Sequence, residues 1–159
     1  MNIFVLSECP IEAAQMQCDK HVVKMIVETA QMLCTVGTGL YKRTHASHPC
    51  TVWAGRSQAN FEWLVAHGLA LCSEYTYRYG KRHRTQDVIE GIIEPGAWDV
   101  EGLTEFALAM PDEYKRPTAV ESYRAYYHSK SHFARWTRRE VPGWWRVDSR
   151  SLRDGVYND

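Results

Sequence analysis

The segment from Ser57 to Tyr79 reads SQANFEWLVAHGLALCSEYTYRY and carries the strongest helical pattern in the chain. Its apolar residues recur every three or four positions, which is the spacing of one face of an α-helix. The members of this stripe are Phe61, Leu64, Val65, Gly68, Leu71, Cys72 and Tyr75. The segment therefore predicts one long helix at the centre of the fold.

Shorter helices are predicted on both sides of this segment. A second periodic stretch covers 22–34, and Gly37 and Gly39 end it. Helix-start signals are Ser7 with Pro10, Ser47 with Pro49, and Asp19 as a candidate cap. Further short helices are predicted near 85–92, 102–109 and 117–129, whereas residues 2–6 favour an isolated extended segment outside any sheet. The sequence thus predicts an all-α, compact single-domain helical bundle over 1–159, with one long central helix and irregular loops.

Composition excludes several classes of protein. The 159 residues suit one domain with a sizeable core, and 19 basic residues balance 19 acidic ones. This balance excludes a histone-like basic protein and an acidic disordered tail, and no apolar run is long enough to span a bilayer. The five cysteines are an odd set without a CxxC pair, and no leader precedes them, so we expect reduced thiols and a cytoplasmic protein.

The zero net charge hides a segregation of charge along the chain. Residues 85–122 contain nine acidic side chains but only two basic ones, Lys115 and Arg116. On both sides of this segment, over 75–84 and 123–139, basic residues alternate with aromatic ones. Such segments fit a surface that contacts phosphate and stacks on bases, and they equally fit solvated helix ends.

The predicted helix over 22–34, together with the residues just before it, carries one polar face. His21 and Glu28 are seven positions apart, so they differ by only about 20° around a helix, and Lys24 lies between them. A carboxylate beside an amine suits cleavage of a glycosidic bond, because the acid can protonate or stabilise while the amine attacks the sugar carbon to form a Schiff base. The alternative is a solvated polar stripe opposite the core.

A second polar line follows the long helix through Trp63, His67, Glu74 and Arg78. Glu74 and Arg78 have the i,i+4 spacing of a helical ion pair, which is more often structural than catalytic. Histidines and cysteines also occur close together, but none has the spacing of a zinc motif, and phosphate-loop and GxSxG signatures are missing. We therefore predict no metal and no cofactor.

Several motifs together resemble a known family. The stretches Ala13 to Met25, His48-Pro49, Trp53 and Glu74 to Gly80 are similar to a widespread group of small, uncharacterised bacteriophage proteins over most of the chain. That group distantly resembles the pyrimidine-dimer DNA glycosylases of the phage endonuclease V type, compact all-α enzymes that cut the glycosidic bond of a damaged base and then the DNA backbone by lyase chemistry. The matching features are Asp19-x-His21 with the catalytic glutamate at Glu28, a proline-led segment at Pro49, and Glu74 four positions before Arg78.

The sequence departs from that family in three respects. In the family the attacking amine is exposed when the initiator methionine is removed before a small residue, whereas Asn2 disfavours removal. The resemblance therefore implies the α-amine of Met1 as nucleophile, with Lys24, one turn from Glu28, as a substitute. The segment before Asp19 is also longer here, and the relatives are strongly basic. A neutral chain predicts weak duplex binding or a smaller nucleotide substrate.

Three functional hypotheses follow. The first is a phage-encoded DNA glycosylase and AP-lyase-like enzyme, with Glu28 as acid or electrostatic stabiliser, His21 and Arg78 around it, and Met1 or Lys24 as the amine. The second is an enzyme of nucleotide metabolism or thymine modification on the same scaffold. The third is a non-catalytic phage protein that binds a host defence factor through its aromatic C-terminal region.

The first hypothesis also assigns binding roles. It gives phosphate contacts to Arg82, Arg84, Arg135 and Arg138, and base stacking to Trp53, Trp63 and Trp136. The other candidate substrate-binding residues are Asp19, His48 and Glu74. The predicted partners are DNA or a nucleotide, with a host protein under the third hypothesis and no membrane, and the predicted location is the host cytoplasm.

Overall fold

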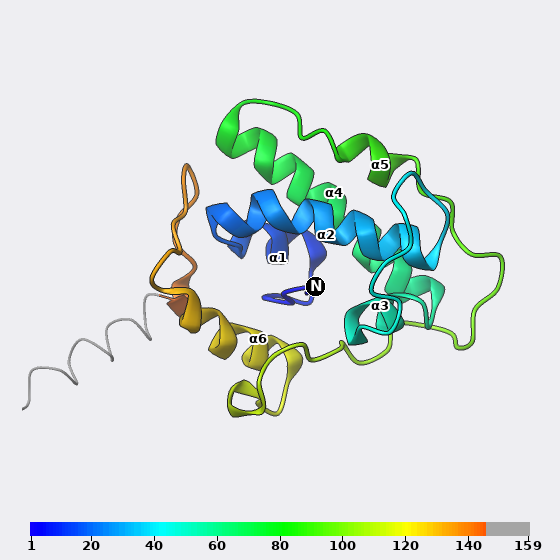
Figure 1. The fold of residues 1–159 in the computed structure, drawn as a ribbon. Coiled ribbons are helices and arrows are strands. Elements are labelled where there is room, and N and C mark those ends of the chain that lie inside the picture. The colour runs from blue at the N-terminus through cyan, green and yellow to red at the C-terminus, as the bar shows by residue number, and fades with distance from the viewer. Residues whose placement is uncertain (146–159) are drawn as a thin grey trace, which may run out of the picture.

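The computed structural model describes residues 1–145, whose regular elements are all helical (Figure 1). They are α1 (Pro10–Met16), α2 (Asp19–Val36), α3 (Pro49–Ala54), α4 (Gln58–Tyr79), α5 (Gln86–Glu90), η1 (Asp112–Tyr114), α6 (Ala119–Tyr127) and η2 (His128–Lys130). The only extended pairing in this part of the chain is a single bridge between Thr38 and Ile93. The predicted all-α fold is confirmed.

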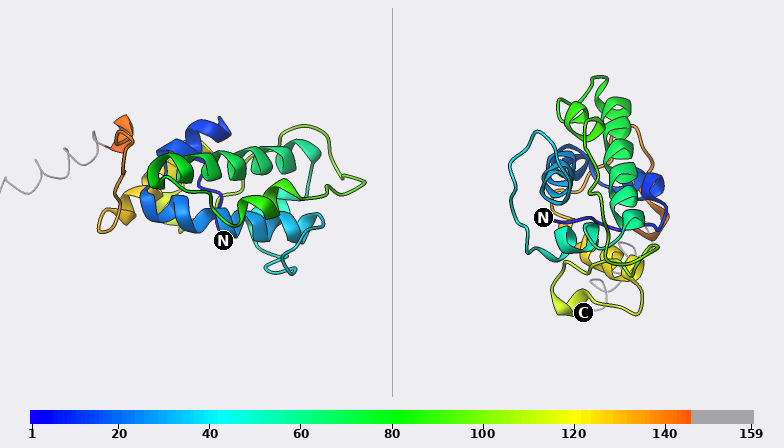
Figure 2. Two further views of the ribbon diagram at one scale, coloured as in Figure 1. Left: turned by 90° about the horizontal axis from the view of Figure 1, so that it is seen from above. Right: turned by 90° about the vertical axis from the view of Figure 1, so that its right-hand side faces the viewer.

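Helix α4 is the central element. Helices α1 and α2 both pack along it, as the two side views show (Figure 2). The Ser57 side chain accepts a hydrogen bond from the backbone of Asn60 at the start of α4, and Gly80 ends the helix in the left-handed conformation. A side-chain carbon at Gly68 would lie 2.9 Å from Thr29 of α2, so this glycine permits the close approach of the two helices. The prediction of the long helix is confirmed.

The first six residues cross the interior between α2 and α6 (Figure 1). Asn2 organises this crossing, because its Oδ1 accepts hydrogen bonds from the backbone of Ile3 and Phe4 and its Nδ2 donates to the carbonyl of Ala109. Phe4 has a φ of 37° and contacts aromatic rings of α6. Residues 2–6 lie outside any helix or strand, as predicted, and they are buried.

The predicted helix over 102–109 is wrong. This segment is irregular, and Phe106 inserts between Trp53 and Trp63, with ring centroids 5.3 and 5.1 Å away. Side chains of other elements bond its backbone, including Asn60, which accepts from the nitrogen of Thr104. The apolar residues of this segment are spaced like those of one helix face. They nevertheless pack onto α3 and α4 from an irregular backbone that has no helical hydrogen bonds.

Two predicted helix starts are displaced by one or two positions. Cys9, not Ser7, directly precedes α1, and Asp19 is the first residue of α2 instead of its cap. At α3 the cap is His48, whose Nδ1 accepts from the backbone of Cys50. None of the described helices is long and apolar enough to cross a membrane.

Candidate active site

The carboxylate of Glu28 lies between two amines. The α-amine of Met1 is 3.8 Å from Glu28 Oε1 on one side, and Lys24 Nζ is 3.8 Å from the same oxygen on the other. The Glu28 side chain is 18% exposed, so solvent reaches it while the protein shields most of it. The Lys24 side chain is 70% exposed and extends from α2. The structure thus brings together an acid and both candidate nucleophiles.

The amine of Met1 is held by buried contacts. The Met1 side chain is only 3% exposed and packs against the core, and the Asn2 hydrogen bonds fix the next peptide. The longer segment before Asp19 does not carry the amine away from Glu28, because residues 10–16 fold as α1 against α4. The methionine side chain therefore anchors the N-terminal end of the chain.

His48 completes one wall of this site. Burial lowers the pKa of His48, the positive amine of Met1 lowers it further, and Glu28 opposes the shift. Its Nδ1 caps α3, so the ring orientation is fixed by the backbone. His48 therefore lies beside the amine and the acid as a largely neutral ring at physiological pH.

His21 lies on the same side of α2, two turns before Glu28, within an aromatic cluster. Its ring stacks on Phe4 at 4.5 Å and contacts Tyr127 at 5.2 Å. Burial lowers the pKa of His21 to about 4, and nearby Lys130 and Lys24 contribute. Two helical turns correspond to roughly 10.5 Å, so His21 packs the base of the site instead of touching the acid.

His67 is a second buried neutral histidine, on α4. Nδ1 lies 2.9 Å from the carbonyl of Pro10 and Nε2 lies 3.1 Å from Gln17 Nε2, which assigns the proton to Nδ1. Burial lowers the pKa of His67 to about 4, although the Pro10 hydrogen bond acts in the opposite direction. His67 therefore joins α1 to α4 as a structural residue.

We expect acid to destabilise the protein through His21 and His67. Both pKa values are lowered on folding, so below pH 6.5 the unfolded chain binds protons that the folded chain excludes, and stability falls as the pH decreases toward 4. The expected loss is on the order of 2 kcal/mol per histidine between pH 7.5 and 5. Urea unfolding at several pH values measures it, with exposed His132→Gln as the control. A midpoint independent of pH over this range would contradict both assignments.

Arg78 is at the centre of a buried ionic network away from the amines. Its Nη1 donates to Asp19 at 3.0 Å, its Nε donates to Glu74 at 2.9 Å, and its Nη2 donates to the carbonyl of Gln15. Arg139 adds two hydrogen bonds to the same Glu74 carboxylate. The network joins α1, α2, α4 and the segment after η2. Asp19 is nine residues before Glu28, or about 13.5 Å along the helix, so Arg78 does not contact the candidate acid.

The comparison with protein families is consistent with this geometry. The family model described as pyrimidine dimer DNA glycosylase matches residues 1–87, more than half of the chain. The chain belongs to the pyrimidine-dimer DNA glycosylase family. No curated protein and no solved structure matches it. The matched part of this family member includes Met1, Lys24, Glu28 and Arg78, while α6 lies beyond it.

In this glycosylase-family protein, the tryptophans predicted to stack on bases make contacts with other parts of the protein. Trp53 and Trp63 are 3% and 7% exposed and pack against each other. Trp136 donates from its indole nitrogen to the carbonyl of Met16 and contacts Trp145. In this structure neither Trp53 nor Trp63 presents a face to solvent, because both rings form part of the core.

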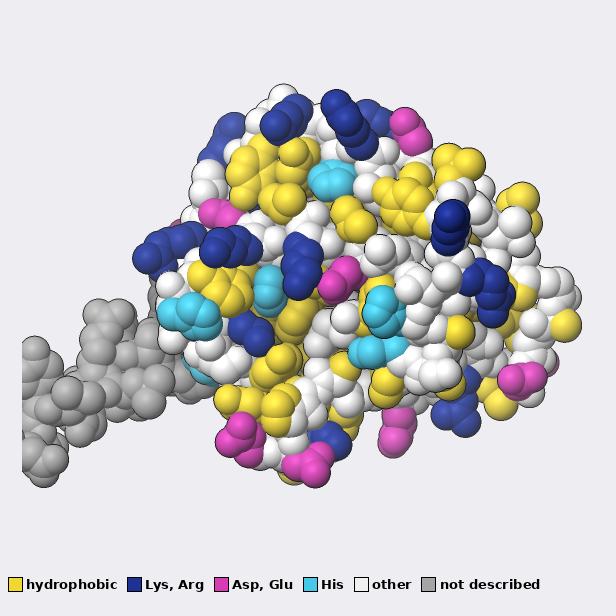
Figure 3. Space-filling view, in the orientation of Figure 1, with side chains coloured by type: hydrophobic (Ala, Val, Ile, Leu, Met, Phe, Trp, Pro, Cys, Tyr) yellow, Lys and Arg dark blue, Asp and Glu magenta, His cyan; other side chains and the backbone are white. Residues whose placement is uncertain are grey.

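The arginines predicted to bind phosphate differ in the partners that they already have within the protein. Arg82 is paired with Asp87 and Glu90, and Arg138 lies over the ring of Tyr77. Arg135 donates to the carbonyl of the preceding residue. Arg84 is exposed and has no ion pair within residues 1–145. On the face viewed in Figure 3, lysine and arginine side chains gather over α2 and the end of α4.

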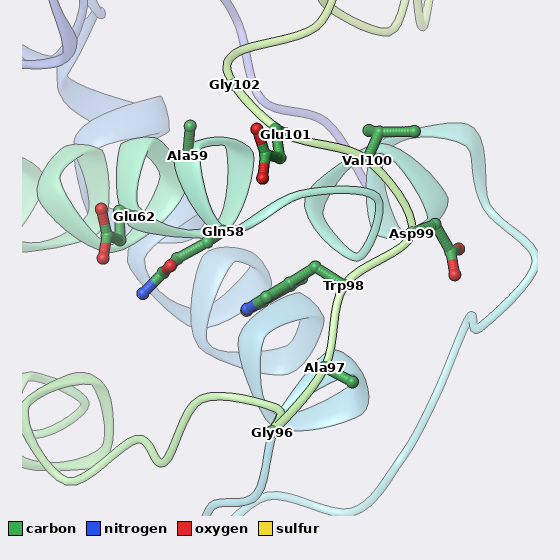
Figure 4. Close-up of a pocket in the computed structure, with 10 residues that line it drawn as sticks. All are labelled: Gln58, Ala59, Glu62, Gly96, Ala97, Trp98, Asp99, Val100, Glu101 and Gly102. Carbon is green, nitrogen blue, oxygen red and sulfur yellow. The ribbon is translucent and has the colours of Figure 1, made fainter.

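A pocket of about 760 Å³ lies at the start of α4, and it has a different character (Figure 4). Three carboxylates line it, those of Glu62, Asp99 and Glu101, with Trp98 beside Gln58. Acidic walls repel phosphate, so this pocket is not where a member of a DNA-acting family would hold the DNA backbone. Over residues 1–145, no group of three His, Cys, Asp or Glu side chains is placed to hold a metal ion.

Sequence reasoning missed the anchoring role of Asn2 in this family member. The residue was considered only for its effect on methionine removal, yet its side chain bonds both Ile3 and Phe4 and the distant Ala109. One signal was present, since Asn2 is the single polar residue before the apolar run Ile3 to Leu6. A polar side chain at the head of a buried run must find partners, and backbone groups supply them.

Proposed function

We propose that this protein is a DNA glycosylase with AP-lyase-type chemistry, in which the α-amine of Met1 is the nucleophile and Glu28 is the acid–base group. The observation that supports this most directly is the 3.8 Å separation of the amine from the Glu28 carboxylate. Membership of the pyrimidine-dimer DNA glycosylase family supports DNA as the substrate. The motif resemblance to bacteriophage proteins supports a phage origin and action in the host cytoplasm.

The reaction uses one amine and one carboxylate. The Met1 nitrogen gives up a proton to Glu28 and attacks C1′ of the deoxyribose, so that a C–N bond to the enzyme forms. The glycosidic bond breaks, and the base leaves with the bonding pair and takes up a proton. The nitrogen then loses its second proton, and the ring oxygen takes up a proton as its bond to C1′ breaks, which gives a Schiff base. Glu28 accepts the C2′ proton, the C3′–O bond breaks with the phosphate as leaving group, and water finally hydrolyses the Schiff base to free the amine. Glu28 is the nearest base for these transfers.

Met1 is favoured over Lys24 by its surroundings. Both nitrogens lie 3.8 Å from Glu28, but the Met1 side chain is buried while that of Lys24 is 70% exposed. A fixed nucleophile loses less conformational freedom on reaching a reactive geometry than a long mobile side chain does. The amine of Met1 is therefore the preorganised one.

Borohydride trapping tests the assignment. Abasic-site DNA is incubated with the protein and borohydride, and the reduced adduct is located by peptide mass spectrometry. We expect the adduct on Met1, and we expect that two extra residues placed before Met1 abolish it because they displace the amine. Lys24→Gln is the matched control and keeps most of the trapping. An adduct on Lys24, or none at all, would overturn the nucleophile.

The zero net charge favours one rival, an enzyme of free nucleotides, because a neutral chain gains little from counterion release on duplex DNA. The same reaction mixtures therefore include a free deoxynucleoside monophosphate in place of DNA. Release of base from the monophosphate without an adduct on DNA would support this rival. No reaction with either substrate would favour the non-catalytic hypothesis of a host-factor binder.

A further inference from the structure

A cluster of rings lies where the end of α4 passes over α2. Tyr75 contacts Tyr79 at 5.0 Å between centroids and His83 at 4.8 Å. Tyr79 is 39% exposed, and neighbouring Val23 of α2 is 38% exposed. Burial lowers the pKa of His83, whereas the backbone of Val23 opposes this shift, so the ring lies next to α2. Tyr75 is partly buried against the core, and Tyr79 presents its ring to solvent.

A pocket continues this surface along α2. Its volume is about 430 Å³, and its walls include Val27 and Gln31 of α2 and Leu40 and Tyr41 of the following loop. Leu40 is 82% exposed. The Tyr41 hydroxyl is hydrogen-bonded to Thr85 Oγ1 at 2.8 Å, so its ring is held in place.

Thr85 connects the ring cluster to the pocket. The backbone nitrogen of Thr85 donates to His83 Nδ1, while its hydroxyl bonds Tyr41, so a single residue joins both ends. Val23 and Val27, the second of which lines the pocket, are one turn apart on α2 and therefore share one face of this helix. We call this surface, from Tyr79 and His83 to Leu40 and Tyr41, the α2 groove.

Unpaired cations border the α2 groove. Lys81 and Arg84 follow α4, Lys42 lines the pocket, and none of the three has an ion-pair partner among residues 1–145. The adjacent acids Asp87 and Glu90 both pair with Arg82, whose single charge offsets one of these two carboxylates. In Figure 3, apolar side chains and a histidine lie between bands of lysine and arginine over α2 and the end of α4. The groove is therefore apolar along its floor and cationic along its edges.

We propose that the α2 groove binds unpaired nucleotides of DNA, with bases stacked on Tyr79 and Tyr41 and phosphates at Lys81 and Arg84. Alternating aromatic faces and unpaired cations are the combination that single-stranded nucleic acid requires, because every base has a π-face and every nucleotide a phosphate. The proposal rests on the proposed function in taking DNA as the substrate. It adds that the preferred DNA has single-stranded character.

The groove and the candidate acid lie on opposite flanks of one exposed helix. Val23 and Glu28 differ by about 140° around α2, and Lys24 lies on the solvent side between them. The separation across a helix is about 10 Å, which corresponds to roughly three stacked nucleotides at about 3.4 Å each. A strand with its reacting sugar at Glu28 therefore extends its neighbouring nucleotides across Lys24 into the groove.

This arrangement also accounts for affinity without net positive charge. Strongly basic relatives bind duplex DNA through phosphate contacts, which salt weakens. Stacking of bases on aromatic side chains supplies binding free energy that salt screens little. A chain with 19 basic and 19 acidic residues gains more from stacking than from its charge. The α2 groove gives this chain a place for such stacking.

Binding of unmodified DNA tests the proposal. Fluorescence anisotropy compares a single-stranded oligonucleotide of about 12 nucleotides with the blunt duplex of the same sequence. We expect tighter binding of the single strand. Tyr79→Ala should weaken it about 5- to 150-fold, the range for loss of one stacked base, and Tyr79→Phe should restore it because the ring remains. Changing both Lys81 and Arg84 to Gln should reduce the salt slope by about 1.4.

Tyr77→Ala is the matched control. Tyr77 is on the same helix with 45% exposure, but it faces Arg138 and Arg139 on another side of α4, so its loss should leave binding unchanged. Equal binding by wild type and Tyr79→Ala, or tighter binding of the duplex, would overturn the groove. An adduct at Met1 together with unchanged binding by Tyr79→Ala would support the proposed function and reject the groove. Groove-dependent binding without any adduct would instead remove the proposed function and keep the groove.

Discussion

Replacing Glu28 by glutamine is expected to lower the rate of base release and of strand cleavage by about 10²- to 10⁴-fold. This is the usual contribution of a general acid–base group, and Glu28 is the carboxylate that contacts both amines. Glutamine keeps the size of the side chain but can neither take the proton of the Met1 amine nor return it. Single-turnover assays on DNA with a pyrimidine dimer and on abasic-site DNA measure the two steps separately.

The matched control for this prediction is Glu62→Gln. Glu62 is an exposed carboxylate on α4 that lines the acidic pocket, and the charge change is identical. We expect activity close to that of the wild type, because neither Met1, Lys24 nor Glu28 lines this acidic pocket. Wild-type rates in Glu28→Gln would show that the carboxylate takes no part in the chemistry.

Removing Arg78 is expected to have the largest effect on stability. Arg78→Met should lower the free energy of unfolding by about 3–5 kcal/mol, because it removes the ion-pair partner of Asp19 and leaves the buried Glu74 carboxylate with Arg139 alone. The Arg78 side chain is fully enclosed, so water cannot replace its contacts. Urea unfolding followed by circular dichroism measures the loss.

Arg82→Met is the control for Arg78→Met. Arg82 also pairs with two carboxylates, but all three side chains are exposed, and pairs of this kind contribute little in water. We expect no resolvable change in its unfolding midpoint. If Arg78→Met cannot be purified folded, Arg78→Lys retains the charge without the guanidinium fork and should show an intermediate loss. Wild-type stability in either Arg78 variant would contradict a structural network.

The motifs shared with the glycosylase family divide into two kinds of residue. Asp19, Glu74 and Arg78 form the ionic network that joins α2 to α4, and Arg78 also bonds the Gln15 carbonyl of α1. Glu28 is the member of the pattern that faces the amines. A short motif can therefore be retained for the scaffold as much as for the reaction, and only the contacts of each residue separate the two.

The sequence predicted correctly the elements that depend on interactions between residues close together in the chain, and it failed where distant residues decide the structure. Helices α2 and α4 were predictable because long apolar periods repeat within each segment. The segment over 102–109 was not, because Phe106 and Thr104 are placed by Trp63 and Asn60 of α4, some forty residues away. Helix starts at Ser7 and Asp19 were displaced because a cap depends on the local turn as well as on residue type.

The sequence by itself determined that this protein is helical and that Lys24 and Glu28 share one face of α2, because both are consequences of a 3.6-residue period. Only the tertiary structure decided that the amine of Met1 meets Glu28, since 27 positions separate them along the chain. That meeting depends on the burial of Met1 and on Asn2, which donates a hydrogen bond to the distant carbonyl of Ala109 and accepts one from the backbone nitrogen of Ile3. Packing likewise placed Arg78 in the interior and left Tyr79 at the surface, which no helical period specifies.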